Sequence, residues 1–588
     1  MIKQKRKLPF LYYSIVFVFF FIILVQLFFH QIINGKKYEE ISRKNYIRIR
    51  RINANRGMIL DEKLRPLAFN RPAINLYFTP YLISDRQKFL DFVTEHVNIS
   101  RDSLERLIRE NRFRTFEEIL ITEDLQEDQL ARIAELMNFY PELSLKAEIQ
   151  RHYSVPNHYT GYIAKINETE FRQYRNQDYT MNSKIGKLGI EKYYEGLLAG
   201  QSGYEIIQVD ATGRNLNLFR NDLNKPPIHG FNVVLTINLE LQEYINTIFP
   251  RDKAGAVVVL NTKTGGILSY NSFPEYDQNW FTEGLSQAQW EYLNDHAQKP
   301  LIDRVVNGAY SPGSTFKTVS ASFGLEKNYI TEYTTLASCR GGMQIGNRFF
   351  RCWQEHGHGR TSVNRATVVS CDVFYYDLST RMALDDFSDF SYRNYLHTKT
   401  GIDLPTERFG FFPTTEYYRS RLGNYFGTAG IRANLIIGQG EILVTPLAMA
   451  AYYCALANDG LWQTPHLFQE AFNENGTIDY EFFEKTTQKL PVTDSNLKIV
   501  QKALYDTVYS WEGTARRARV NGAEVYAKTG STENPHGDET HASMAGYVKW
   551  DGEPEIAFYV ILENAGSGGS VAGPIAGQII SFYQNNIR

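Results

Sequence analysis

The sequence has almost no net charge, no internal repeat and few cysteines, and these absences narrow the classes of protein to consider. Its 63 Lys and Arg residues balance 65 Asp and Glu residues, which leaves a formal charge of −2. That balance gives no reason to expect a nucleic acid as a partner. The 588 residues contain no repeat or long low-complexity segment, and they suffice for two to four domains, each with its own core.

The N-terminus lacks the small-residue cleavage site that ends a secretory signal peptide. An uncharged, mostly apolar run covers residues 8–29, and four Lys and Arg residues precede it within 1–7. About twenty helical residues cross the roughly 30 Å hydrocarbon layer of a membrane. The run therefore predicts one membrane helix over 8–29, with a cytoplasmic tail over 1–7 and the remainder outside the cytoplasm. A buried core helix is the alternative.

Two segments that differ in their residue pattern follow the apolar run. Residues 30–235 form a mixed, polar region that includes a charged, helically patterned stretch near 100–137. Farther on, residues 254–260 (Ala-Gly-Ala-Val-Val-Val-Leu) and 267–270 (Ile-Leu-Ser-Tyr) flank a turn sequence. This pattern predicts a β-hairpin.

Further strand-like runs occur near the C-terminus, after a region with a helical pattern. Residues 446–458 are helical in pattern, and 545–548 and 556–562 are strand-like. Strands at both ends with helices between them predict one antiparallel sheet, closed by its first and last strands, with helices packed on it. The predicted fold class is therefore α+β.

Ser314 and Lys317 place a hydroxyl and an amine three residues apart, after the Pro-Gly turn in residues 310–317 (Tyr-Ser-Pro-Gly-Ser-Thr-Phe-Lys). If a helix begins at this turn, both side chains lie on one face. A serine hydroxyl becomes a nucleophile when an adjacent base takes its proton, and a desolvated lysine can be that base. The pair alone is a common pattern, and a capping serine is the structural alternative for Ser314.

Two later motifs turn this common pair into part of a specific active-site pattern. Residues 370–372 read Ser-Cys-Asp, and residues 528–531 read Lys-Thr-Gly-Ser. Serine–lysine, serine-x-amide and lysine-threonine-glycine, in this order, form the active-site set of penicillin-recognising acyl transferases. We expect Ser370 to relay a proton to the leaving amine, since a hydroxyl both donates and accepts. We expect Lys528 to supply a second cation near Lys317.

Asp372 departs from this set, which usually has asparagine at that position. A carboxylate beside two lysines is expected to be ionised and to hold Lys317 as ammonium, which opposes its use as a base. A purely structural aspartate is the alternative.

Motifs elsewhere in the chain extend the similarity. They are residues 56–61 (Arg-Gly-Met-Ile-Leu-Asp), 67–70 (Leu-Ala-Phe-Asn), 189–191 (Gly-Ile-Glu), 194–195 (Tyr-Glu), 210–214 (Asp-Ala-Thr-Gly-Arg), 272–277 (Ser-Phe-Pro-Glu-Tyr-Asp), 438–440 (Gly-Gln-Gly) and 445–447 (Thr-Pro-Leu). With them the chain resembles the class B, monofunctional penicillin-binding proteins over nearly its whole length. Residues 350–353 (Phe-Arg-Cys-Trp) and 357–359 (Gly-His-Gly), with Asp372, resemble the rod-shape (elongation) subgroup. No glycan-polymerising domain precedes the transpeptidase part, which argues against a class A enzyme.

This resemblance implies a pedestal (dimerisation-type) domain over 30–235 and a serine β-lactamase-like transpeptidase domain over 236–588. It implies a single-pass protein of the inner membrane with a periplasmic catalytic domain. The implied activity is D,D-transpeptidation, which cross-links peptidoglycan stem peptides through a serine acyl-enzyme and is inhibited by β-lactams. No cofactor is expected for this chemistry. A membrane glycan polymerase of the rod-shape complex is the implied partner.

The Lys-Thr-Gly-Ser segment is expected to bind the substrate. The amine of Lys528 and the hydroxyls of Thr529 and Ser531 would hold the terminal carboxylate of a D-Ala-D-Ala peptide. Gly530 would let the peptide lie close to the backbone. By resemblance, the amides of Ser531 and of the nucleophile form the oxyanion hole. His541 would line the acceptor side, with an exposed loop histidine as the alternative.

Three of the four cysteines cluster in sequence around a histidine with the spacing C-x12-C-x5-H-x12-C. The cluster comprises Cys339, Cys352, His358 and Cys371. Three thiolates and one imidazole match a closed, structural zinc site. A disulfide, which an oxidising compartment favours, and separate buried thiols remain alternatives. His356 could replace His358, and Cys454 in its apolar helix reads as a core residue.

Rival functions follow from the same motifs. A serine β-lactamase or D,D-carboxypeptidase would pass the acyl group to water, but the middle region has no convincing E-x-x-x-N segment for deacylation. A septal transpeptidase differs from an elongation enzyme only at the level of the subgroup. An acylated signalling receptor or a scaffold would keep its function without Ser314.

Overall fold

The computed structural model describes residues 7–38, 47–97, 99–113, 117–175, 177–208, 224–423, 428–473, 476–478, 486–534 and 539–588. The tail residues 1–6 and the motif at 210–214 lie outside these ranges. The chain divides into two compact units. One contains the chain up to Arg56 together with Ala199–Gly230, and the other contains Gly57–Leu198 and Phe231–Arg588.

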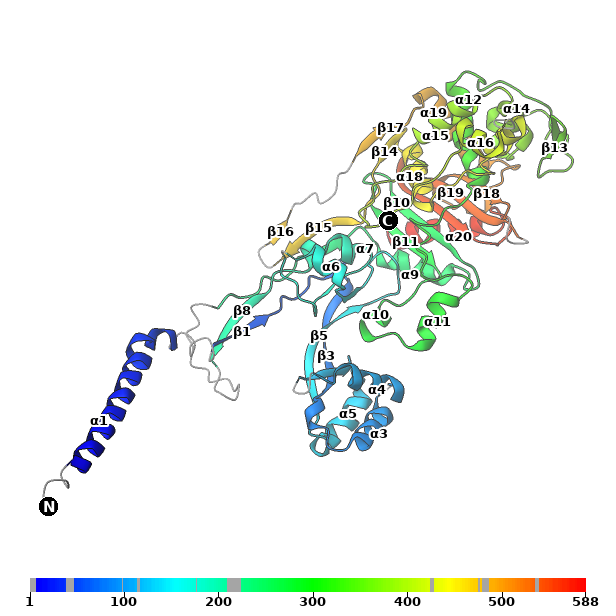
Figure 1. Ribbon diagram of the computed structural model, residues 1–588. Coiled ribbons are helices and arrows are strands. Elements are labelled where there is room, and N and C mark those ends of the chain that lie inside the picture. Colours follow the sequence, from blue (N-terminus) through cyan, green and yellow to red (C-terminus); the bar gives the residue numbers. More distant parts are fainter. Residues whose placement is uncertain are drawn as a thin grey trace, which may run out of the picture. The chain divides into compact units, whose positions relative to one another are not determined.

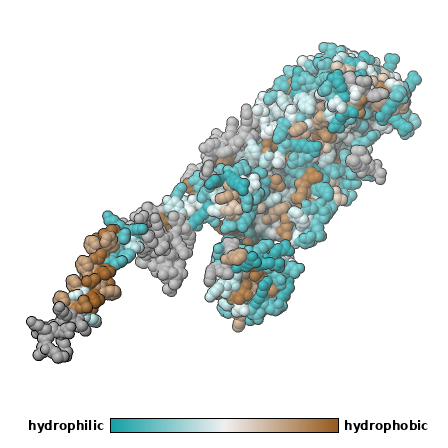
Figure 2. All heavy atoms as spheres, viewed as in Figure 1, coloured by the Kyte–Doolittle hydropathy of each residue, from teal (hydrophilic) through white to brown (hydrophobic). Residues whose placement is uncertain are grey.

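The first unit contains the apolar helix. Helix α1 (Lys7–Phe28) continues into the π-helical turn η1 (Phe29–Ile33). The segment Phe10–Ile33 is long and apolar enough to cross a membrane, and none of it is buried. Its apolar surface forms the brown column of Figure 2. This helix fits a single membrane anchor. In the same unit, β1 (Ile47–Ile52) pairs antiparallel with β8 (Gly203–Gln208).

The second unit opens with a mixed α/β region (Figure 1). Its elements are β2 (Ile59–Leu60), β3 (Pro66–Phe78), η2 (Pro80–Leu82), α3 (Arg86–His96), α4 (Arg101–Glu110), β4 (Ile119–Thr122), α5 (Glu127–Leu136), η3 (Met137–Phe139), β5 (Leu143–Tyr153), β6 (Ile163–Lys165), α6 (Glu168–Gln173), β7 (Lys184–Gly186), α7 (Gly189–Tyr193), α8 (Glu195–Leu198) and β9 (Asn232–Leu235). Its main sheet has the order β16-β15-β9-β2-β3-β4, and β5 pairs with β3. Strands β15 (Phe468–Asn473) and β16 (Gly476–Ile478) come from far along the chain, so the sheet joins the two predicted domain regions.

The charged stretch near 100–137 is not continuously helical, contrary to the sequence-based expectation. Ser100 caps α4 through its side chain, and α4 ends at Glu110. Strand β4 then pairs antiparallel with β3 before α5 begins. The run Ile-Leu-Ile-Thr of β4 contains three β-branched residues, which favour an extended strand.

The rest of the second unit forms an antiparallel sheet with helices around it. Its elements are α9 (Leu239–Ile248), β10 (Gly255–Asn261), β11 (Ile267–Phe273), α10 (Asn279–Glu283), α11 (Gln287–Asp295), η5 (Gly313–Phe316), α12 (Lys317–Glu326), β12 (Gly342–Ile345), β13 (Arg348–Arg351), α13 (Val363–Val368), α14 (Asp372–Ser379), α15 (Leu384–Tyr392), α16 (Thr415–Leu422), α17 (Ala429–Ile436), α18 (Pro446–Ala457), β14 (Leu461–Gln463), β17 (Thr487–Lys489), α19 (Asp494–Tyr509), η7 (Arg516–Ala518), β18 (Glu524–Thr532), β19 (His541–Trp550), β20 (Glu553–Leu562) and α20 (Ala572–Asn586).

The central sheet has the order β11-β10-β20-β19-β18. The predicted hairpin is confirmed, because β10 and β11 pair antiparallel. The first strand, β10, also pairs with the last, β20, so the ends of this part of the chain close the sheet as predicted. This pairing places β18, with its Lys-Thr-Gly-Ser segment, at one edge of the sheet.

Alternating side chains of β10 serve two separate cores. Val257 and Val259 belong to a cluster that includes residues of α9 and α20. Ala256 and Val258 belong to a larger cluster that includes α18, which is buried along its whole length. Burial on both faces explains why β10 reads as a continuous apolar run rather than an alternating one. The helices on the α18 side include α12, which carries Lys317.

Candidate active site

Ser314 lies on a tight turn that leads directly into a buried helix. The 3-10 turn η5 carries Ser314, and the α-helix α12 begins only at Lys317. Gly313 has φ of +54°, a conformation that L-residues with side chains rarely adopt. A Cβ atom at Gly313 would lie 2.5 Å from the Thr532 hydroxyl. Glycine at this position therefore lets the turn pack closely against strand β18.

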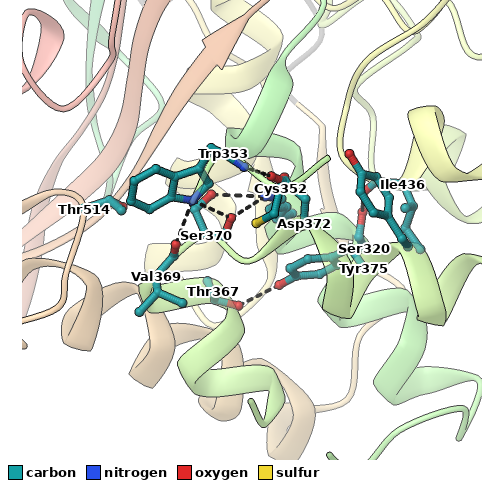
Figure 3. A network of polar contacts seen from close by, with 12 residues as sticks. Ser320, Cys352, Trp353, Thr367, Val369, Ser370, Asp372, Tyr375, Ile436 and Thr514 are labelled. Carbon is teal, nitrogen blue, oxygen red and sulfur yellow. Dashed lines mark hydrogen bonds and ion pairs between the residues drawn. The ribbon is translucent and has the colours of Figure 1, made fainter. Parts of the chain in front are cut away.

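Two buried amines meet at the hydroxyl of Ser370. Figure 3 shows Ser370 near Asp372 and Trp353. Lys317 Nζ donates to Ser370 Oγ at 3.1 Å, and Lys528 Nζ donates to the same oxygen at 3.0 Å. Lys317 also donates to the Ser370 carbonyl at 3.0 Å and to Asp372 Oδ1 at 2.6 Å. The fold thus brings all three motifs into one group, although they lie far apart in the sequence.

Burial governs the electrostatics of this group. It lowers the pKa of Lys528 well below its usual value, and the positive charge of Lys317 lowers it further. Burial also raises the pKa of Asp372, while the charge of Lys317 opposes that rise. Because a buried charge is stable only when it is paired, Asp372 is the counter-charge of Lys317, which lies 2.6 Å away.

The Lys-Thr-Gly-Ser segment runs along the edge strand β18. Thr529 donates to Thr514 Oγ1 at 3.0 Å, and Ser531 Oγ accepts from the Gly568 amide at 3.1 Å. A Cβ atom at Gly530 would lie 2.4 Å from the Ser543 hydroxyl and 3.1 Å from the Pro312 carbonyl oxygen, so glycine lets β18 pack closely against the segment before Ser314. Their hydrogen bonds hold the Thr529 and Ser531 side chains in place along this edge.

Two predicted site residues, Ser314 and His541, take no part in the hydrogen bonds that the described residues make within this group. Ser314 is partly exposed, and among the described residues the group's hydrogen bonds do not include its hydroxyl. His541 pairs with Thr532 in the β18–β19 register, and its ring meets Tyr310 edge-on at 5.9 Å. The Asn564 amide donates to His541 Nδ1 at 3.1 Å. Burial lowers the pKa of His541.

The predicted metal ligands come together in space. One ligand atom from each of Cys339, Cys352, His358 and Cys371 lies within 4.8 Å of the others. His358 Nδ1 is 3.7 Å from Cys339 Sγ and 3.6 Å from Cys352 Sγ. Zn–S bonds of about 2.3 Å and Zn–N bonds of about 2.0–2.1 Å give an edge of about 3.6 Å in a tetrahedron. The cluster could therefore hold a structural metal.

The chemistry of the donors agrees with this fit. All four cysteines of the chain are free, and Cys454 lies apart from the cluster in α18. A hydrogen bond with Cys371 lowers the pKa of Cys352, and the same bond raises the pKa of Cys371, while burial raises the pKa of Cys339. The cluster without metal therefore favours one thiolate, and binding a metal would release the protons of the other two thiols. His356 is exposed and does not belong to the cluster.

Sequence reasoning assigned no role to two residues that contact the site. Trp353 follows Cys352 and donates from its indole nitrogen to carbonyl groups beside Ser370 (Figure 3). Thr514 accepts a hydrogen bond from Thr529. The position of Trp353 next to a predicted metal ligand was the available signal for it, whereas nothing in the sequence around Thr514 indicates this contact.

Comparison with known proteins agrees with the geometry. Residues 255–581 match the penicillin binding protein transpeptidase domain, and residues 51–235 match the penicillin-binding protein dimerisation domain. The peptidoglycan D,D-transpeptidase MrdA of Escherichia coli is 32% identical over 591 residues, which cover 95% of this chain and 91% of that protein.

Solved structures share the fold. A complex of penicillin-binding protein PBP2 with MreC from Helicobacter pylori has a TM-score of 0.78 and 24% identity, covering 92% of this chain and 100% of that one. A structure of a peptidoglycan synthase complex, described as coordinating polymerization and crosslinking, has a TM-score of 0.72 and 25% identity. It covers 100% of this chain and 99% of that one.

The chain therefore belongs to the penicillin-binding protein transpeptidases, and within them to the rod-shape (elongation) subgroup. It is a serine-type peptidoglycan D,D-transpeptidase that binds penicillin. The predicted family, α+β fold class and activity are thus confirmed, and the subgroup distinguishes the chain from the septal enzymes.

Proposed function

We propose that Ser314 is the nucleophile and Lys317 its general base. The hydroxyl oxygen of Ser314 attacks the carbonyl carbon between the two D-Ala residues of a stem peptide while Lys317 takes its proton. The amide C–N bond breaks and leaves an ester on Ser314. The proton passes by way of Ser370 to the departing D-Ala amine. The contact of the Ser370 hydroxyl with both buried amines is the observation that supports the base and the relay. The place of Ser314 on the turn that leads directly into Lys317 supports its role as the nucleophile.

The edge of β18 is the proposed binding site for the donor peptide. Lys528, Thr529 and Ser531 present one amine and two hydroxyls for the terminal carboxylate. The Ser531 and Ser314 amides would stabilise the oxyanion. The close packing of Gly313 and Gly530 supports this arrangement, because it keeps the turn and the strand adjacent.

The ester then passes to an acceptor. The amine of a second stem peptide attacks the ester carbonyl and gives one proton to Lys317. The bond to Ser314 Oγ then breaks, and Lys317 passes that proton to the Ser314 oxygen. The product is a cross-linked peptide dimer. His541 is the proposed residue on the acceptor side.

The metal in the cysteine–histidine cluster is proposed to be zinc, held by Cys339, Cys352, His358 and Cys371. Its role would be structural: all four donors belong to the protein, which leaves no open position for substrate. Cys371 lies between Ser370 and Asp372, so zinc would fix the segment that carries both.

The organisation of the whole chain completes the proposal. Residues 1–7 would be cytoplasmic, 8–29 would cross the inner membrane, 30–235 would form the pedestal, and 236–588 would form the periplasmic transpeptidase domain. A membrane glycan polymerase of the rod-shape complex is the proposed partner. The similarity to a synthase complex that coordinates polymerization and crosslinking supports this pairing.

Product analysis tests the reaction. The full-length protein in detergent, given lipid-linked glycan polymerised by a separate enzyme, is expected to form peptide dimers with release of one D-Ala per cross-link. The Ser314→Ala variant should form none. Release of D-Ala without dimers would instead indicate a D,D-carboxypeptidase, and cross-linking by Ser314→Ala at the wild-type rate would leave the serine without a chemical role.

A further inference from the structure

Trp353 is a largely exposed aromatic residue whose polar groups are nevertheless bonded to the active site. Its side chain is 58% exposed. The indole Nε1 lies 3.1 Å from the Val369 carbonyl and 3.2 Å from the Ser370 carbonyl. Its backbone amide donates to Asp372 Oδ2 at 3.2 Å. One residue therefore contacts three of the four residues of the 369–372 segment, Val369, Ser370 and Asp372 (Figure 3).

The segment that Trp353 contacts is strained at Ser370. This residue has φ of +53°, in the left-handed region. A residue other than glycine costs free energy there, and the conformation persists only where the surroundings impose it. The Ser370 carbonyl has two donors, Lys317 Nζ and the Trp353 indole. These two bonds fix the direction of the peptide group that follows Ser370.

The direction of that peptide group sets the place of the Ser370 hydroxyl. The hydroxyl must lie between Lys317 and Lys528 to contact both amines. Lys317 cannot hold the turn unaided if its protonation changes during the reaction, because a neutral amine donates more weakly than an ammonium group. The indole N–H is only a donor and keeps its proton, so it donates equally well throughout the catalytic cycle.

Trp353 also lies next to the cysteine–histidine cluster. It follows Cys352 directly after β13, and its ring lies 5.4 Å from the ring of His358. The cluster is thus tied to the 369–372 segment in two ways: covalently through Cys371, and by the hydrogen bonds of Trp353.

We propose that Trp353 is a positioning residue that holds Ser370 in its left-handed conformation, so that its hydroxyl stays between the two lysines. The inference rests on the proton-relay role proposed above for Ser370. Trp353 takes no part in bond making, and its effect on the reaction passes through the Ser370 turn.

The test is a Trp353→Phe variant of the full-length protein. Phenylalanine keeps an aromatic ring and the backbone amide but removes the indole N–H. Acylation by benzylpenicillin, followed over a range of concentrations, separates the binding constant from the first-order acylation rate. We expect that rate to fall by about ten- to a hundred-fold, as for other small displacements of a reacting group. The binding constant should change by less than about threefold, since the substrate-binding strand is untouched.

A matched control and two further readouts make the test decisive. Trp290→Phe changes another half-exposed tryptophan, on α11, and should acylate as the wild type does. The thermal midpoint and metal content of Trp353→Phe should equal those of the wild type. An unchanged acylation rate, a change in the binding constant alone, or loss of metal would each overturn the inference. Undiminished labelling of Ser314→Ala would instead overturn the proposed function.

Discussion

Replacing Lys317 by methionine is expected to slow acylation by a penicillin about a thousandfold or more. General-base catalysis typically contributes between about a hundredfold and ten-thousandfold. Lys317 also orients Ser370 through two hydrogen bonds, and these are lost with it. Methionine keeps the unbranched apolar stem in a buried site. A time course of labelling with a fluorescent penicillin measures the effect.

Two companion variants separate chemistry from folding. Lys317→Met leaves Asp372 buried without its ion-pair partner, which destabilises the fold. The double variant Lys317→Met/Asp372→Asn removes both charges, so its thermal midpoint should return toward that of the wild type while acylation stays slow. Lys327→Met changes an exposed lysine just beyond the same helix and should label normally. Recovery of acylation in the double variant would show that Lys317 acts only through stability.

Loss of the proposed zinc is expected to slow acylation as well. Protein purified without chelator should contain about one zinc per chain. Cys352→Ser replaces a soft thiolate by a hydroxyl, which zinc binds poorly. We expect this variant to lose most of its zinc, to melt several degrees lower and to acylate at least tenfold more slowly, because Cys371 links the cluster to Ser370 and Asp372. Metal analysis, thermal melting and penicillin labelling report the three effects.

The fourth cysteine supplies the control. Cys454 is buried in α18 and lies outside the cluster, so Cys454→Ala should keep its zinc and its acylation rate. A well-folded wild-type protein that holds no metal and has Cys339 disulfide-bonded to Cys352 would refute the zinc proposal.

Much of the catalytic fold could be predicted because its signals are local. Continuous apolar runs marked β10 and β20, and a turn sequence joined β10 to β11. The N-terminal helix, long and apolar enough to cross a membrane, was equally clear from its length and lack of charge. The stretch around 100–137 was misjudged because charged residues with helical spacing flank β4, whose place depends on pairing with β3. The pairing of β15 with β9 is likewise a long-range contact without a local signal.

The residues of the candidate site likewise fall into those that the sequence predicted and those that only the folded chain shows. The order of the motifs predicted Ser314, Lys317 and Lys528, because each motif pairs residue types whose chemistry is known. The left-handed conformation of Ser370 has no sequence signal, since serine is not a residue that favours it. The contacts of Trp353 and Thr514 arise from packing between distant segments. Motifs therefore indicate the reacting groups, whereas the residues that hold them in place become visible only in the folded chain.

The most direct test of the central claim is to locate the covalent adduct. Full-length protein treated with benzylpenicillin and digested with a protease should carry one penicilloyl group, and tandem mass spectrometry should place it on Ser314. A Ser311→Ala variant, altered three residues earlier in the same segment, should give the same adduct. An adduct on any other residue, or one of undiminished yield in Ser314→Ala, would contradict the account.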